Sequence, residues 1–248
     1  MAAPIVDLRD VRKSFERKEV LRGISLTVHK GTTLAVMGGS GAGKTVLLRI
    51  IPGLIRSDSG EVRLFETRLD TLREEQMLPV RRRTGFVFQG AALFDSLSVF
   101  ENVAYPLREH TRFSVGEITD RVHRFLGLVG LPGTDDLMPA ELSGGMRKRV
   151  GIARALVMEP EIVFFDEPTA GLDPTNARLV AELIAQLRTG VCDTAIVVTH
   201  DIDFADMVAD QMAILHQGRF LEMGTPAEMH ASANPAVQKF LAGEMREG

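Results

Sequence analysis

The stretch "VMGGSGAGKTVLLRIIPG", residues 36–53, decides the fold of this protein. Gly38, Gly43, Lys44 and Thr45 satisfy the P-loop pattern G-x-x-x-x-G-K-[ST], in which backbone N–H groups surround the phosphates of a nucleotide. Glycines let such a loop wrap an anion, and the helix that begins near Gly43 adds its N-terminal dipole. The residues expected to line this nucleotide site are Gly38, Gly39, Ser40, Gly41, Ala42, Gly43, Lys44 and Thr45.

The two residues after the last glycine have the chemistry that a nucleotide requires. Lys44 is expected to act in catalysis by reaching the β- and γ-phosphates of ATP, and the Thr45 hydroxyl to ligate Mg²⁺. A plain glycine turn between strand and helix is the alternative reading of the stretch. A dinucleotide-binding loop is excluded, because in either alignment of G-x-G-x-x-G the third glycine is replaced, by Lys44 or by Val46.

The composition limits the class of protein. The 248 residues are 45% hydrophobic and 25% charged, as in soluble globular proteins, and the net charge of -4 argues against a nucleic-acid partner. The single cysteine, Cys192, cannot form an intrachain disulfide. The start "MAAPIVDLRD" lacks the pattern of a signal peptide, and the longest apolar runs are much shorter than the roughly 18 residues of a membrane span. Any work at a membrane is therefore expected to pass through a partner.

Apolar strands alternate with helices along most of the chain. Residues 4–15 and 20–29 have the interleaved pattern of half-exposed antiparallel strands, whereas later strands are continuously apolar and so are expected to be parallel and buried. The fold class predicted is α/β, a P-loop NTPase with a mostly parallel core sheet, an N-terminal antiparallel β subdomain and a helical insertion. We expect one domain over residues 1–248, with the helical subdomain at about 95–158 and short C-terminal helices at about 226–243. Further strands are expected at 33–37, 84–89, 161–165 and 194–199, a hairpin at 211–224, and helices at 43–51, 174–188 and 203–209.

Two carboxylates stand at the end of an apolar strand in "EIVFFDEPTAGLDP". Ligands of parallel sheets bind at the carboxyl edge, so Asp166 and Glu167 are expected to meet the P-loop there. Asp166 is suited to hold Mg²⁺ through water, and Glu167 to accept a proton from an attacking water. The alternative is that these acidic residues only cap the next helix.

Two more strands end in polar side chains. Gln89 follows "TGFVF" and is suited to bind the metal or its water, while His200 follows "TAIVVT" and is suited to donate to a γ-phosphate. Each alone is a weak signal, because a lone His or Gln is more often a surface residue. Together the four strand ends predict a nucleotide-hydrolysing site.

A second helix start has the character of an anion site. In "ELSGGMRKRVGIARALV", Ser143 is placed to cap a helix, and Gly144 and Gly145 expose N–H groups. The motif "LSGGM" resembles the signature of ATP-binding-cassette (ABC) ATPases. The P-loop, Gln89, the signature, the two carboxylates, "AGLDP" and His200 follow one another in the order of that family, so the resemblance covers roughly residues 5–230.

The resemblance implies a second copy of the chain as a partner. ABC ATPases pair head to tail, so Ser143, Gly144 and Gly145 would complete the ATP site of the other copy, and Asp173 would lie across the interface. Phe15 matches the position that stacks on adenine, with a core Phe as the alternative. Met146 departs from the usual glutamine of the signature, which leaves contacts beyond the phosphates in doubt while the phosphate-facing residues are intact.

A narrower resemblance concerns the process that ATP drives. "GGSGAGKTVLLRIIPGLIRSDSGEV", "FQGAALFDSLSVFENVAYPLRE" and "LSGGMRKRV" are similar to ATPase subunits of Mla and Mce-type phospholipid transporters, which act between the inner and outer membranes. In that family the segment after the glutamine meets a transmembrane permease, and Phe94, Leu97, Val99 and Phe100 are either such docking residues or core.

The same resemblance implies a STAS-domain regulator, a substrate-binding Mce-type protein and a peripheral location at the cytoplasmic face of the inner membrane. The ATPase of a small-solute importer and an iron–sulfur assembly ATPase are the alternatives. The run Arg81 to Arg83 is interpreted as a solvated surface, with contact to a lipid headgroup or a partner as the alternative. Segment 235–241 and the tail 243–248 would support a subunit contact or cap the fold; the transported molecule and its direction depend on partner subunits.

Overall fold

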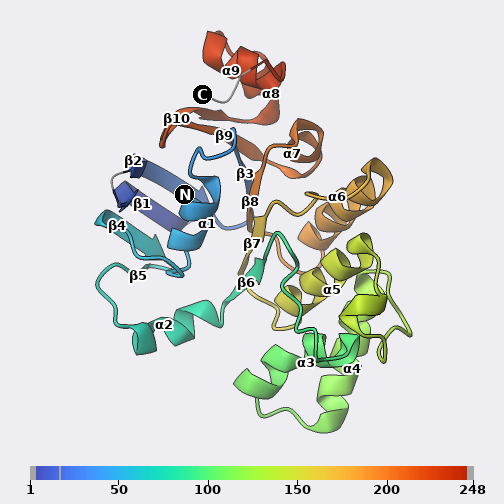
Figure 1. The fold of residues 1–248 in the computed structure, drawn as a ribbon. Coiled ribbons are helices and arrows are strands. Elements are labelled where there is room, and N and C mark those ends of the chain that lie inside the picture. Colours follow the sequence, from blue (N-terminus) through green and yellow to red (C-terminus); the bar gives the residue numbers. More distant parts are fainter. Residues whose placement is uncertain (1–3, 17, 245–248) are drawn as a thin grey trace. The chain divides into compact units, whose positions relative to one another are not determined.

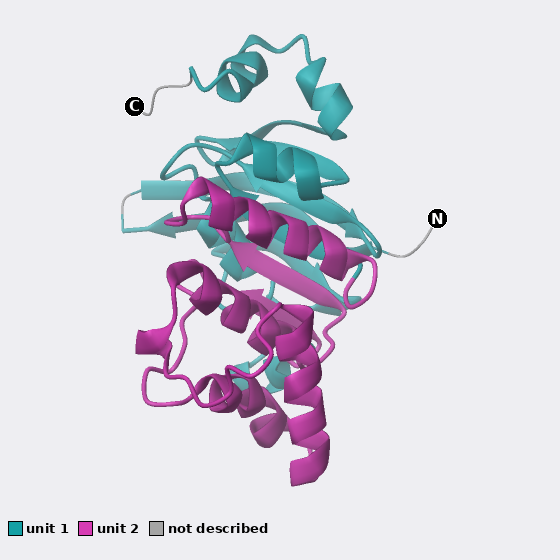
Figure 2. Cartoon of the chain, turned by 90° about the vertical axis from the view of Figure 1, so that its right-hand side faces the viewer, with its two compact units in different colours: residues 1–81, 193–248 teal, residues 82–192 magenta. Residues whose placement is uncertain are grey.

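The computed structural model describes residues 4–16 and 18–244, and the chain divides into two compact units (Figure 2). Unit 1 comprises residues 1–81 and 193–248, and unit 2 comprises residues 82–192. Both contain parallel strands and helices, as expected of an α/β protein. The boundaries of a single domain and of a helical subdomain at about 95–158 stay predictions.

The centre of unit 1 is a buried strand with parallel neighbours on both sides. Strand β3 is apolar except for Thr33 and buried throughout, and it pairs in parallel with β8 and β9. Strand β10 pairs antiparallel to β9 through the predicted hairpin, and helices α1 and α7 pack on β8 and β3 (Figure 1). The bounds are β3 (Thr33–Met37), α1 (Lys44–Ile50), β8 (Ala195–Thr199), α7 (Ile202–Val208), β9 (Gln211–His216) and β10 (Arg219–Gly224).

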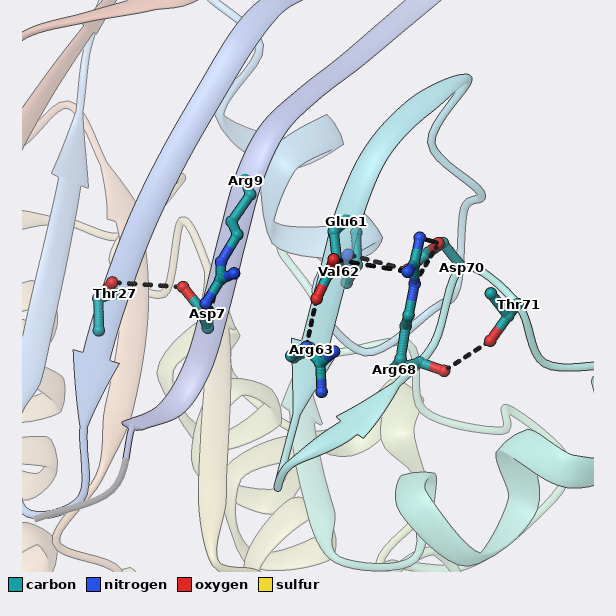
Figure 3. A network of polar contacts seen from close by, with 9 residues as sticks. All are labelled: Asp7, Arg9, Thr27, Glu61, Val62, Arg63, Arg68, Asp70 and Thr71. Atoms are coloured by element: carbon teal, nitrogen blue, oxygen red, sulfur yellow. Dashed lines mark hydrogen bonds and ion pairs between the residues drawn. The ribbon is translucent and has the colours of Figure 1, made fainter.

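An antiparallel sheet forms the rest of the N-terminal part, in the order β2-β1-β4-β5. Its two long strands were predicted, whereas the short strands β4 and β5 are not visible as periodic patterns. One face of the sheet is polar and carries ion pairs along neighbouring strands, seen in Figure 3. Burial raises the pKa of Asp70, but hydrogen bonds from Arg68 and the Val62 amide outweigh it and hold that pKa below its ordinary value. The bounds are β1 (Pro4–Phe15), β2 (Lys18–His29), β4 (Ser59–Leu64) and β5 (Thr67–Arg68).

The C-terminal helices α8 (Pro226–His230) and α9 (Pro235–Leu241) close the core of unit 1. Met229, Val237 and Phe240 are buried in one cluster with residues of β3, α7 and β9. This burial makes α9 part of the fold, in agreement with the capping reading. Of the predicted tail 243–248, residues 245–248 lie outside the described residues.

Unit 2 combines two parallel strands with a set of helices. Strands β6 and β7 pair in parallel, and the first two helices begin with reciprocal Ser–Glu capping boxes, at Ser98 and at Ser114. Residues 98–158 contain three helices and a 3₁₀ turn. The bounds are β6 (Thr84–Val87), α3 (Val99–His110), α4 (Val115–Leu128), η1 (Pro139–Glu141), α5 (Gly144–Leu156), β7 (Ile162–Asp166) and α6 (Pro174–Arg188).

The run Arg81 to Arg83 begins at the last residue of a helix that the sequence did not indicate, α2 (Glu74–Arg81). Arg81 donates to the carbonyl of Gly53 at 2.6 Å and pairs with Glu74. Arg83 pairs with Glu161 at 2.6 Å, beside the start of β7. Arg82 and Arg83 are exposed, as expected of a solvated surface run, whereas Arg81 is partly buried by its contacts with α2 and residue 53.

A buried asparagine shapes the segment before α3. Asn102 is fully buried, and its Oδ1 accepts a hydrogen bond from the Phe94 amide at 2.8 Å. Its Nδ2 donates to the carbonyls of Phe94, Leu97 and Ser98 at 2.9 to 3.1 Å. One side chain thus binds four backbone groups of this segment, and two of these, the Phe94 and Ser98 carbonyls, also accept from the amides of Leu97 and Asn102.

We expect Asn102→Ala to lower the free energy of unfolding by about 2–3 kcal/mol, because it removes the side-chain partner of the Phe94 amide and of the Leu97 carbonyl. For a chain of this size that corresponds to a fall in Tm of roughly 5–10 °C, measured by circular dichroism. Glu109→Ala, an exposed change on the same helix, is the control and should change Tm little. Equal Tm values for the two variants would contradict this role of Asn102.

Candidate functional site

The P-loop joins β3 to α1 and has no room for a side chain at its first glycine. A Cβ on Gly38 would lie 2.3 Å from the carbonyl oxygen of Leu215 on β9, far below van der Waals contact. Gly43, the N-cap of α1, has a left-handed conformation with φ 105°. Lys44 is buried, and its Nζ donates to the carbonyls of Gly38 and Gly39 at 2.7 and 3.2 Å. The loop is therefore closed on itself by the lysine expected to bind phosphate.

Strand register in unit 1 places His200 at the P-loop edge. Met37 of β3 pairs with Thr199 of β8, so Gly38 and His200 are each the next residue along adjacent parallel strands. His200 is exposed, and the following residue, Asp201, caps α7 by accepting from the Phe204 amide at 3.0 Å. Two of the four predicted strand ends are thus brought together within this unit.

Strand register in unit 2 brings the other two ends together. Val87 of β6 pairs with Phe165 of β7, so Gln89 and Asp166 lie at the carboxyl edge of the same pair. Asp166 and Glu167 are both buried, with 1% and 8% exposed surface. How the Gln89 and Asp166 pair lies with respect to the P-loop remains a prediction.

Glu167 has an unusual backbone conformation. Its φ of 48° lies in the left-handed region, which costs about 1–3 kcal/mol for a residue other than glycine. Its carbonyl accepts hydrogen bonds from the Ala170 amide and from Lys148 Nζ, each at 3.2 Å. Strain of this kind concentrates at functional positions, which agrees with the predicted role of Glu167 as general base.

Lys148 is a residue at this site that the sequence reading missed. It lies on α5, is only 6% exposed, and its ammonium also donates to the carbonyl of Gln89. Burial lowers the pKa of Lys148, and the charges of Glu167 and Asp166 oppose that effect. The available signal was the lysine's position five residues after Ser143, on the helix face that meets the two predicted strand ends.

The signature residues begin α5 as predicted. The Ser143 Oγ accepts from the Met146 amide at 3.2 Å and caps the helix. A Cβ on Gly145 would lie 2.8 Å from Oδ1 of Asn176, so a larger residue here would displace the Asn176 side chain of α6. Asp173 caps α6, and hydrogen bonds from the Asn176 side chain and amide lower its pKa. Signature and Asp173 thus lie beside each other in unit 2.

Several predicted surface residues can now be assigned. Phe15 is 45% exposed with Lys13 Nζ 5.2 Å from its ring centroid, so the core reading of Phe15 does not hold.

In the predicted docking segment, Val99 is fully buried and belongs to the core, whereas Phe94 is 42% exposed and packs on Tyr105 with ring centroids 4.8 Å apart. Leu97 and Phe100 are partly buried.

The predicted metal ligands are of the oxygen type that Mg²⁺ prefers. Thr45 offers a hydroxyl, Gln89 an amide oxygen and Asp166 a carboxylate, and Mg²⁺ completes its six ligands with phosphate and water. Among residues 4–16 and 18–244 no cluster of three or more His, Cys, Asp and Glu suited to a metal occurs. A site with one carboxylate is not of that type, so the donor set fits Mg²⁺ bound together with a nucleotide.

The model of the ABC transporter family matches residues 21–170, from the first part of β2 to the residues after β7. The chain belongs to the ABC transporter family. It is 40% identical to the intermembrane phospholipid transport system ATP-binding protein MlaF of Escherichia coli (strain K12), over 97% of this chain and 90% of MlaF. It is 39% identical to the chloroplastic protein trigalactosyldiacylglycerol 3 of Arabidopsis thaliana, over 97% of this chain and 74% of that protein.

The solved structures that resemble the chain are ABC cassettes. A dimeric post-hydrolysis structure of the cassette MJ0796, bound to ADP and Pi, has a TM-score of 0.81 and 32% identity, and the match covers 89% of this chain and 98% of that one. The predicted P-loop ABC fold is therefore confirmed, and the chain is a nucleotide-binding ATPase. The roles of individual residues stay predictions.

We expect Gly38→Ala to weaken ATP binding and to lower the free energy of unfolding by about 1–3 kcal/mol, because the added methyl group forces the loop away from β9. Fluorescent ATP analogue titration and thermal unfolding measure the two effects. Gly116→Ala on α4 is the control, since its Cβ would meet nothing within 4 Å and alanine favours a helix. Unaltered ATP affinity in Gly38→Ala would contradict the close approach of the loop to β9.

Proposed function

We propose that this chain is the ATP-hydrolysing subunit of an Mla-type transporter that moves phospholipid between the inner and outer membranes. The observation that carries this proposal is the 40% identity to MlaF over 90% of that protein's length. Small-solute import and iron–sulfur assembly, the other functions weighed from the sequence, have no comparable support. Transport direction is left to the partner subunits.

The residues of the two strand edges have the chemistry for hydrolysis. Lys44 would bind the β- and γ-phosphates, and His200 would donate to the γ-phosphate. A water oxygen attacks the γ-phosphorus, its proton passes to the Glu167 carboxylate, and the bond from the γ-phosphorus to the bridging oxygen breaks to release ADP. Thr45, Gln89 and Asp166 would hold Mg²⁺, which supplies positive charge to the phosphate oxygens.

A second copy of the chain would complete each site. Related cassettes form dimers, MJ0796 among them. In a head-to-tail dimer, Ser143, Gly144 and Gly145 of one copy would close over the ATP of the other, with Asp173 at the interface. The exposed face of Phe15 would stack on adenine. Closure of the dimer would exclude water and couple hydrolysis to motion.

The transmembrane permease is the partner through which this chain would reach a membrane. No helix in the described part of the chain combines the length and apolar character of a membrane span. The exposed rings of Phe94 and Tyr105 offer a surface for docking. The chain would then be peripheral at the cytoplasmic face of the inner membrane. A STAS-domain regulator and a substrate-binding Mce-type protein rest on the family resemblance alone.

We expect Glu167→Gln to retain ATP binding, to lose about 10²- to 10⁴-fold in turnover, and to trap a closed dimer, because the amide cannot accept the proton of water. Phosphate release and size-exclusion chromatography with ATP measure turnover and dimer. Glu75→Gln, an exposed change in α2, should keep wild-type turnover. Turnover near wild type in Glu167→Gln would remove Glu167 from the general-base role.

We expect deletion of this chain to change the phospholipid content of the outer leaflet of the outer membrane, because transport in either direction alters that content, and the sign of the change would report the direction. Lipidomics of surface-labelled cells would compare the deletion with cells rescued by wild type or by Lys44→Ala. Only the wild type, which can use ATP, should restore the normal content. Unchanged surface phospholipid in the deletion would overturn the lipid function and favour a small-solute importer.

A further inference from the structure

One face of α5 contacts the segment that follows β6. Lys148, Gly151 and Arg154 are spaced three residues apart and so share this face. Lys148 donates to the Gln89 carbonyl, and a Cβ on Gly151 would lie 3.2 Å from the Cβ of Ala91. Arg154 donates to the carbonyls of Ala91 and Ala92 at 2.8 and 2.9 Å. The signature helix therefore holds residues 89–92 along its length.

Lys148 contacts the second strand end as well. Its ammonium donates to the carbonyl of Glu167 at 3.2 Å, within unit 2 and away from solvent. The same carbonyl accepts from the Ala170 amide, so two donors support the left-handed conformation of Glu167. One charged group thus ties the backbone of Gln89 to the backbone of Glu167.

A buried ammonium is costly unless its N–H groups are paired. An apolar side chain of similar length would fill the same space on α5 without that cost. Two neighbouring buried positions of α5, Val150 and Ile152, do have apolar side chains. The lysine is therefore poorly explained as packing alone. Its two carbonyl partners belong to the residues proposed as a metal ligand and as the general base.

We propose that Lys148 is a positioning residue for ATP hydrolysis. From the signature helix, its ammonium holds the Gln89 carbonyl and the Glu167 carbonyl at a fixed distance from each other. This inference rests on the proposed ATPase site and not on the transported molecule. Loss of the tie would let Glu167 leave its left-handed conformation and would displace its carboxylate from the attacking water. Misplacement on the order of 1 Å costs about 10²-fold in rate.

The test compares kcat, KM for ATP, ATP affinity and Tm in the full-length protein. Lys148→Met keeps the length of the side chain and removes the donors. We expect kcat to fall about 10- to 100-fold while ATP affinity stays within about threefold, because the lysine acts on Glu167 and Gln89 and not on the nucleotide. Lys148→Arg, which keeps the charge and several donors, should recover most of the lost turnover.

Arg149→Met is the matched control on the same helix. Arg149 also donates to two carbonyls, those of Val129 and Gly130, and burial lowers its pKa, but it contacts no predicted site residue. Arg149→Met should lower Tm, but at temperatures below the unfolding transition its kcat should equal that of the wild type. If Lys148→Met does not fold, Lys148→Gln, whose shorter amide reaches fewer acceptors, must show the same loss of kcat at constant ATP affinity.

Three results would overturn the proposal. The first is a kcat of Lys148→Met within about twofold of wild type. The second is a loss of kcat in Arg149→Met that is as large, in proportion to its loss of Tm, as the loss in Lys148→Met. The third is a loss of ATP affinity in Lys148→Met equal to its loss of kcat. Failure of the proposed function is read separately, from turnover of the wild type and of Glu167→Gln. If the wild type hydrolyses ATP, Glu167→Gln abolishes that turnover and Lys148→Met has a normal kcat, only the positioning role of Lys148 is rejected.

Discussion

The register of parallel strands fixes the places of the residues expected to handle nucleotide in this chain. Pairing of β3 with β8 places Gly38 beside His200, and pairing of β6 with β7 places Gln89 beside Asp166. Parallel strands have their carboxyl ends on one edge, so residues about 80 to 160 positions apart in the sequence are brought together by strand pairing alone. The loops that follow β6 and β7 can then have backbone conformations with positive φ, which these two strands do not have.

Those conformations are strained and are supported from one helix. Ala91, Ala92 and Glu167 all have positive φ, between 48° and 61°. Each such residue costs about 1–3 kcal/mol, and hydrogen bonds to charged donors contribute about 1.5–3 kcal/mol. The carbonyls of all three accept from cationic side chains of α5, Arg154 for the alanines and Lys148 for the glutamate. The basic residues of α5 thus offset the strain of two functional loops.

Much of this fold could be predicted from the sequence because its signals are local. The strand 33–37, the helix 174–188 and the hairpin 211–224 have the predicted bounds, since continuous apolar runs and turn residues mark them. Strands β4 and β5 and helix α2 were not predicted: they are short, polar, and in α2 carry Pro79 within the helix. Lys148 was missed because the burial of a cation depends on carbonyls supplied by distant segments, and periodicity cannot report it.

The same contacts indicate how a signal would travel within unit 2. The guanidinium of Arg154 lies 5.7 Å from the centroid of the exposed Phe94 ring and also binds the carbonyls of Ala91 and Ala92. Asn102 binds the backbone of the same segment from α3. A partner that displaces Phe94 would therefore act on α5 as well as on the loop, and α5 is capped by Ser143 and carries Lys148. Gln89 and Glu167 would then shift with the signature helix, because Lys148 and Arg154 of that helix bind the carbonyls of residues 89, 91, 92 and 167.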